Sequence, residues 1–225
     1  GAAQGTAGCK GGSCNIAIGF RSNYNVKTLN NNNVALGRLT GSANSTGCGN
    51  TWIGNTAGYL QIGGNGNVAI GQGARQRPTQ GGHNIAIGCY ASCAANSQNG
   101  FGCFHNIAIG MNAGQCAKHC AGNNILLGHN TGRNVTCLGN VIIGHSAGTS
   151  VTNARCNVIM GTLSGVSLTS GSCNVILGAY SARGMTTASH NVVIGQRSGQ
   201  GPATGCCNVI IGQCAAMQLT SAFGN

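Results

Sequence analysis

One five-residue pattern of polar and apolar positions recurs along the chain: an Asn, an aliphatic residue, an Ala or aliphatic residue, another aliphatic residue and a Gly. The Gly follows the Asn by four residues in every copy. The copies begin at Asn15, Asn33, Asn50, Asn67, Asn84, Asn106, Asn124, Asn140, Asn157, Asn174, Asn191 and Asn208. Such regularity is the mark of an internal repeat.

The spacing of the copies indicates the fold. Successive copies lie 16 to 18 residues apart, except for one step of 22. This period is too short for helical-pair repeats and fits one turn of a β-solenoid. The sequence therefore predicts an all-β parallel β-solenoid of twelve coils of about 17 residues, on the order of 58 Å long. We assign residues 1–13 to a lead-in or cap, 14–219 to the solenoid and 220–225 to a tail.

Alternation within the motif predicts which side chains fill the coil. The first and third positions are aliphatic nearly everywhere, which is typical of the buried face of a strand, so we expect them inside. A small residue lies seven positions after each Asn and fits a narrow inward site. A weaker apolar column, eleven positions after the Asn, predicts a second short strand per coil: it comprises Val26, Val135, Val151, Leu168, Met185 and Leu219.

By the same alternation, the middle motif position is expected to point outward. An outward apolar column needs a cover, and identical chains around a symmetry axis would provide one. This candidate oligomer face comprises Ala17, Ala35, Trp52, Ala69, Ala86, Ala108, Leu126, Ile142, Ile159, Ile176, Val193 and Ile210.

The repeated Asn and Gly residues have structural explanations. Asn at a solenoid corner can bond backbone groups and its own copies in the adjacent coils, so the Asn column is expected to form a structural ladder. The motif Gly is expected to serve a tight turn or a close backbone approach. Neither residue stands in the strand-then-helix context that a nucleotide-binding loop requires.

Composition narrows the functional classes. The chain has 11 Lys and Arg residues, no Asp or Glu, and a formal net charge of +11. Without carboxylates, most hydrolase mechanisms are excluded, and we expect no enzymatic activity. The basic residues are scattered, so we expect no specific nucleic-acid binding, but a diffuse attraction to an anionic partner such as a host-surface glycan. No apolar stretch of about 18 residues is present, and we expect no membrane insertion.

Fourteen Cys residues favour an oxidising location, extracellular or on a virion surface. Cys156, Cys173 and Cys207 directly precede a motif Asn, and adjacent coils bring such residues about 5 Å apart, within the range of a disulfide. We therefore predict a Cys156–Cys173 disulfide. A second candidate is Cys93–Cys103, across the 22-residue coil.

Histidines near the cysteines raise the alternative of a zinc site. His83 and His105 share the column before the Asn, and His119 lies between Cys116 and Cys120. The spacing matches no standard zinc pattern, so we expect neither a metal nor another cofactor. A Cys-His nucleophilic pair is disfavoured because no carboxylate is present to orient it.

The motif resembles that of a known family. Asn-Val-Ala-Ile-Gly at 67–71 and Asn-Ile-Ala-Ile-Gly at 84–88 and 106–110 are similar to the head repeats of trimeric autotransporter adhesins and of related phage or large-virus tail-fibre and surface proteins. The resemblance spans roughly residues 14–216. It implies a left-handed parallel β-roll, three chains side by side, and a role in binding host surfaces.

Three functions are consistent with these observations. The leading hypothesis is a structural fibre or spike protein of a virion or cell surface, a homotrimer that mediates attachment. The first alternative is a subunit of an extracellular filament or coat whose coils stack end to end between chains. The second is an ice-binding solenoid, which would require a regular outward array of Thr or small residues, whereas Thr is placed irregularly here.

Overall fold

The computed structural model describes residues 14–24, 31–76, 80–92, 104–116, 122–201 and 204–218. Over these residues the chain is all-β, without helix. Twelve parallel strands form one sheet in chain order, which confirms the predicted β-solenoid. The strands are β1 (Ile16–Ile18), β2 (Val34–Leu36), β3 (Thr51–Ile53), β4 (Val68–Ile70), β5 (Ile85–Ile87), β6 (Ile107–Ile109), β7 (Ile125–Leu127), β8 (Val141–Ile143), β9 (Val158–Met160), β10 (Val175–Leu177), β11 (Val192–Ile194) and β12 (Val209–Ile211).

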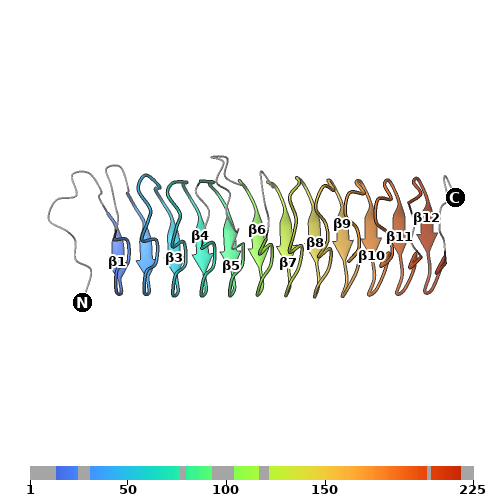
Figure 1. Ribbon diagram of the computed structural model, residues 1–225, viewed down its shortest axis with the longest axis horizontal. Helices are drawn as coiled ribbons and strands as arrows, with labels where there is room; N and C mark the ends of the chain where they lie inside the picture. The colour runs from blue at the N-terminus through green and yellow to red at the C-terminus, as the bar shows by residue number, and fades with distance from the viewer. Residues whose placement is uncertain are drawn as a thin grey trace.

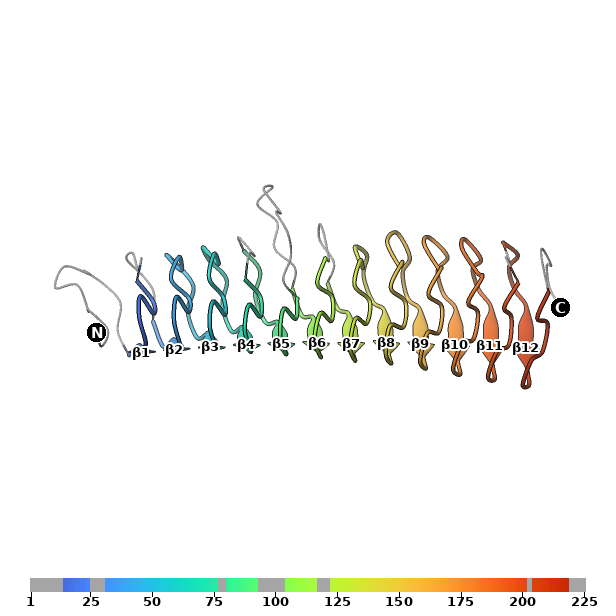
Figure 2. The ribbon, with the colours of Figure 1, turned by 60° about the horizontal axis from the view of Figure 1, so that its bottom comes forward.

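The coils stack in a single row from β1 to β12 (Figure 1). Neighbouring strands pair in register, so that equivalent motif positions face each other; Val141, for example, pairs with Val158. This register holds even across the 22-residue step, where Ile85 pairs with Ile107. The strands line one side of the rod and the turns form the other (Figure 2).

The structure corrects the predicted orientation of the strand side chains. The middle position points into the coil, and Ala35, Trp52 and Ile142 are fully buried. The first and third positions lie on the outside, so the predicted interior and exterior are exchanged. A strand of three residues has two side chains on one face and one on the other, and the narrow coil accommodates the single one. The predicted oligomer face is therefore the core: Ala35, Trp52, Ala69, Ala86, Ala108, Leu126, Ile142, Ile159, Ile176 and Val193 are buried, whereas Ala17 and Ile210, in the end strands, are half-buried.

Two further columns complete the interior. The small residues seven positions after the Asn are buried from Ser22 to Ser198, as predicted. Ala215, in the last described coil, is only half-buried. Eleven positions after the Asn, Val135, Val151, Leu168 and Met185 are also buried.

The predicted second strand per coil is absent from the described residues. Apart from one isolated bridge between Ser189 and Cys206, all strand pairing involves the motif. The chain turns sharply after each strand because positive backbone φ angles recur there. In the eighth coil they are 135° at Gly144, 52° at Ser146 and 55° at Gly148. Beyond these residues the chain around Val151 forms turns and bends rather than a strand.

Some predictions lie outside the described residues. They include the lead-in at 1–13 and the tail at 220–225, together with Val26 and Leu219 of the apolar column.

Candidate assembly face and polar columns

The outward side of the sheet carries two parallel columns of aliphatic side chains, which we call the outer aliphatic face. Twenty-three of its twenty-four residues are aliphatic or Met, and the remaining one is Thr51. The first column is Ile16, Val34, Thr51, Val68, Ile85, Ile107, Ile125, Val141, Val158, Val175, Val192 and Val209. The second column is Ile18, Leu36, Ile53, Ile70, Ile87, Ile109, Leu127, Ile143, Met160, Leu177, Ile194 and Ile211.

Every residue of the outer aliphatic face is at least partly exposed. Exposure reaches 64% at Ile18 and Ile211 in the end strands and is 39% at Ile109 and Met160 within the rod. In Figure 2 the turns lie on the opposite side of the coils and leave this side of the strands uncovered. A continuous apolar strip of this kind is typical of a contact surface.

The Asn column forms the predicted ladder. The backbone N–H and the side-chain Nδ2 of Asn157 both donate to Oδ1 of Asn140, at 3.1 Å each. Asn157 Nδ2 also donates to the carbonyl oxygen of Gly171 at 3.0 Å. The same pattern of donation to the preceding Asn runs from Asn33 to Asn208, through Asn50, Asn67, Asn84, Asn106, Asn124, Asn140, Asn157, Asn174 and Asn191. These side chains are buried and bonded to the chain itself, so they form a structural column rather than a ligand site.

The residue before each motif Asn has a left-handed backbone conformation. Its φ lies between 54° at Cys156 and 71° at Gly139. Gly has no Cβ penalty there, and Asn and His are enriched among other residues with positive φ. The column is Cys14, Asn32, Gly49, Gly66, His83, His105, Asn123, Gly139, Cys156, Cys173, His190 and Cys207. The need for a positive φ therefore explains why His occurs in this column, where it had suggested a metal site.

The cysteines of this column are free thiols. Cys156 and Cys173 occupy adjacent coils, as predicted, and both are exposed, but the structure does not contain the predicted disulfide between them. The other candidate pair, Cys93 and Cys103, lies outside the described residues.

The histidines pair with each other. The rings of His83 and His105 stack with centroids 5.4 Å apart and planes within 6°. The His129 and His145 rings lie 5.1 Å apart on the opposite corner of the strands. Within the part of the chain that the structure describes, no group of three or more Cys and His residues is placed to hold a metal ion. His119 and Cys120 of the zinc alternative fall outside that part.

The interior contains a polar cluster that the repeat pattern did not reveal. Arg75 is only 2% exposed, although the chain has no carboxylate to neutralise it. Its Nε donates to Gln61 Oε1 at 3.3 Å and its Nη2 donates to the carbonyl oxygen of Gly81 at 2.9 Å. The indole N–H of Trp52 donates to the same Gln61 oxygen at 3.4 Å. Trp52 and Gln61 fall in one coil, but the motif pattern predicted the Trp52 column to point outward and so gave no sign of this cluster.

The remaining described Arg side chains are exposed and lie off the outer aliphatic face. They are Arg21, Arg38, Arg133, Arg155, Arg183 and Arg197. The strands of the outer aliphatic face thus contain no charged residue.

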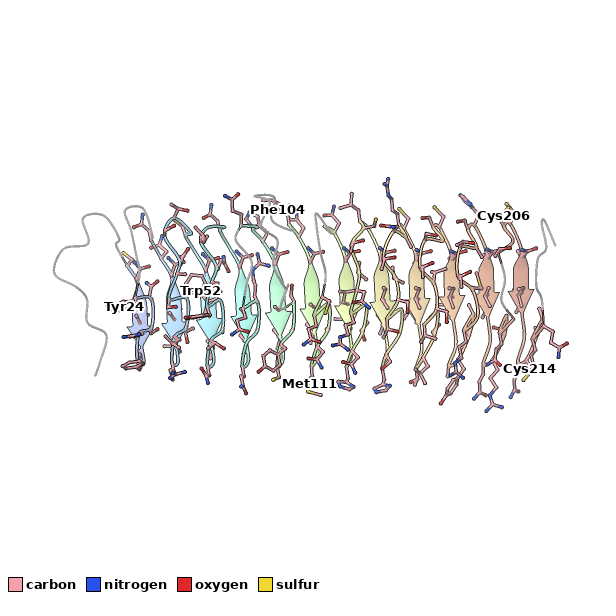
Figure 3. The ribbon with its side chains drawn as sticks, viewed as in Figure 1. Tyr24, Trp52, Phe104, Met111, Cys206 and Cys214 are labelled. Atoms are coloured by element: carbon pink, nitrogen blue, oxygen red, sulfur yellow. The ribbon has the colours of Figure 1, made fainter. Side chains whose placement is uncertain are left out.

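Cys206 and Cys207 form a neighbouring thiol pair near the C-terminal end of the rod; Figure 3 labels Cys206 at the edge where the strands begin. A hydrogen bond between the two side chains, with smaller contributions from desolvation and from the charge of Cys207, raises the pKa of the Cys206 thiol. The Cys206 thiol is therefore less readily ionised than an ordinary cysteine.

Over the described residues, no helix is long and apolar enough to span a membrane. Comparisons of the chain with protein-family models, curated proteins and solved structures give no match.

Proposed function

We propose that the chain is a structural fibre or spike segment of a virion or cell surface, which assembles as a homotrimer through its outer aliphatic face and mediates attachment. The observation that carries the proposal is the continuous apolar strip along β1 to β12, which has no cover within the described chain. Burying such a strip against a partner is favoured by about 25 cal/mol per Å² of apolar area.

A second copy of the same chain is the partner that fits this strip best. The strip repeats one coil at a time, so an identical chain presents the same spacing and the same aliphatic chemistry. Its 24 positions include no charged residue. Since every chain carries a net charge of +11, copies can approach closely only through a surface that lacks cationic groups.

The exposed arginines support a role in attachment. They include Arg38, Arg133, Arg155 and Arg183, which are exposed and lie outside the strands that form the proposed assembly face. A surface with cations and no anions attracts anionic partners such as host-surface glycans.

The test is the native mass of the purified chain, measured by light scattering. A trimer should have three times the mass of the 22.3 kDa chain. Val141→Lys should shift the mass toward that of the monomer while the fold is retained, because Val141 points outward. The matched control is Ile142→Lys, one residue away, which should unfold its coils because Ile142 is fully buried.

Other masses would contradict the trimer. Open-ended polymers that persist in Val141→Lys would indicate end-to-end stacking and the filament function. A stable wild-type monomer would overturn assembly through this face, and thermal hysteresis in that monomer would then support ice binding.

A further inference from the structure

Thiol and imidazole side chains occupy one column on four consecutive coils near the C-terminal end of the rod: Cys156, Cys173, His190 and Cys207. All four residues are exposed. Their φ angles are 54°, 57°, 59° and 63°, so the backbone presents each side chain in the same way. Consecutive members are therefore related by one coil repeat.

Side chains in this column lean in the same direction. A Cβ placed on Gly139 would lie 3.7 Å from the sulfur of Cys156, and one placed on Gly66 would lie 2.9 Å from Nδ1 of His83. Both side chains thus reach toward the preceding coil. The parallel stacking of His83 and His105 shows that neighbours in the column keep equivalent orientations. Equivalent atoms of Cys156 and Cys173 should then repeat at the coil spacing of about 4.8 Å.

The Cα spacing of adjacent coils lies within the disulfide range, but parallel side chains do not bring the two Cβ atoms close enough. An S–S bond requires the two Cβ atoms to approach to about 3.5–4.5 Å, closer than parallel side chains at the coil spacing. Both residues are held in place, because Cys173 N donates to Arg155 O at 2.9 Å and Cys156 N donates to Leu138 O at 3.3 Å. The residues that directly follow the two cysteines are also linked, because Asn174 N donates to Asn157 Oδ1 at 2.9 Å.

The same spacing suits a cation between the two sulfurs. An ion midway along a separation of about 4.8 Å would lie about 2.4 Å from each sulfur, close to the metal–thiolate distance of about 2.3 Å found at zinc sites. We propose that Cys156 and Cys173 form a two-coordinate site for a soft monovalent cation of the Cu(I) class. This site is independent of the proposed assembly face.

Ligand number and softness select the cation class. Among the described residues no third Cys or His completes a metal-binding group, so the four-coordinate geometry of zinc is not available. Two thiolates favour soft ions such as Cu(I). Binding replaces the two thiol protons by one cation, and the two protons are released to solvent. His190 follows Cys173 in the column but does not complete a group of three metal ligands with the two cysteines.

The experiment is an anaerobic Cu(I) titration of the fully reduced chain against a chromogenic Cu(I) chelator. Cys156→Ser and Cys173→Ser should each remove one equivalent of tightly held Cu(I), and the double variant should remove no more than one. Losing one of two fixed ligands should weaken binding at that site by about tenfold or more. The control is Cys48→Ser, because the neighbours of Cys48 in its own column are Asn31 and Asn65.

Circular dichroism should show all these variants folded, since the replaced thiols are at least partly exposed. Equal losses in Cys48→Ser and Cys156→Ser, or two equivalents lost in the double variant, would show independent single-thiol binding and overturn the site. A Cys156–Cys173 cross-link found by peptide mass spectrometry of the chain purified under non-reducing conditions would also overturn it, in favour of the disulfide.

Discussion

At the scale of single residues, the coil depends on backbone conformations that recur in every repeat. In the eighth coil, left-handed or glycine-type φ angles occur at Gly139, Gly144, Ser146 and Gly148. The motif Gly is required for a second reason, because a Cβ on Gly144 would lie 2.5 Å from the carbonyl oxygen of Gly161 in the next coil. This close backbone approach recurs from Gly19 to Gly195, and the positive φ is shared by all twelve copies; together they explain why the position is always Gly.

The two roles of the motif Gly can be separated by mutation. Gly212→Ala introduces only the conformational strain of a φ of 127°, because the nearest atom, Ala215 Cβ, would be 3.8 Å away. It should reduce the free energy of unfolding by about 1–2 kcal/mol. Gly144→Ala adds the clash with the next coil and should cost about 2 kcal/mol more. Urea denaturation measures both, and equal losses would refute a stacking role.

The thiol pair at Cys206 and Cys207 predicts a dependence on pH. The bond with Cys207 raises the Cys206 pKa, so at a given mildly alkaline pH less of the Cys206 thiol is ionised. Cys207→Ala should lower the Cys206 pKa and speed its alkylation by iodoacetamide, as measured by peptide mass spectrometry across a pH series. The alkylation of Cys156 serves as an internal reference. An unchanged alkylation midpoint for Cys206 would contradict the assigned cause.

At the scale of elements, the kinds of side chain that fill the interior differ between the two ends of the rod. Near the N-terminal end, one core cluster consists of Ala35, Trp52, Ala57, Ala69 and Ala74, with Trp52 filling space beside small residues (Figure 3). Toward the C-terminal end, a larger cluster runs from Ala108 to Val193 and is formed mainly by branched aliphatic side chains. Arg75 enters the interior in the coil of β4, where the middle strand position is the small Ala69.

Arg75 is costly to bury, since burying an unneutralised guanidinium removes its hydration. The acceptors Gln61 Oε1 and Gly81 O have other donors: Gln61 Oε1 also accepts from Trp52, and Gly81 O also accepts from Asn67 Nδ2. Arg75→Met should therefore raise the free energy of unfolding by about 1 kcal/mol or more.

The control for this change is the exposed Arg38→Met, which should alter stability by less than about 0.5 kcal/mol. A stability loss in Arg75→Met, seen in the same denaturation series, would show that the hydrogen bonds of the guanidinium outweigh its desolvation.

At the scale of the whole molecule, each coil contacts only its neighbours, as expected for a solenoid. The Asn ladder connects every coil to the next, but the two hydrophobic clusters are separate. Cooperativity in such an array depends on the coupling between adjacent coils, so distant parts of the rod can lose structure at different temperatures.

Trp52 fluorescence can report whether the N-terminal part of the rod unfolds separately, because Trp52 is the only Trp in the chain and is fully buried in the N-terminal cluster. Leu168→Ala, in the other cluster, should cost about 2–5 kcal/mol. It should lower the melting transition seen by circular dichroism more than the transition seen by Trp52 fluorescence. Equal shifts of both transitions would show that the rod unfolds as one unit.

Much of the architecture followed from the sequence alone. The interval between motifs predicted the parallel solenoid, and the motif positions predicted every strand and the Asn ladder, because in-register stacking depends only on the repeat. The number of strands per coil was wrong, since the left-handed conformations at residues such as Ser146 leave no periodic signal in the sequence.

The tertiary structure decided which side of each strand is inside. A period of two shows that neighbouring side chains point to opposite faces of the strand, but not which face is buried. In β8 the outer residues Val141 and Ile143 and the middle residue Ile142 are all apolar, so hydrophobicity does not distinguish the two faces. Closure of a narrow coil places the single middle side chain inside, and this leaves the first and third positions as the outward apolar surface. The sequence thus determined how the coils repeat, whereas the closed coil determined what they bury and what they present to a partner.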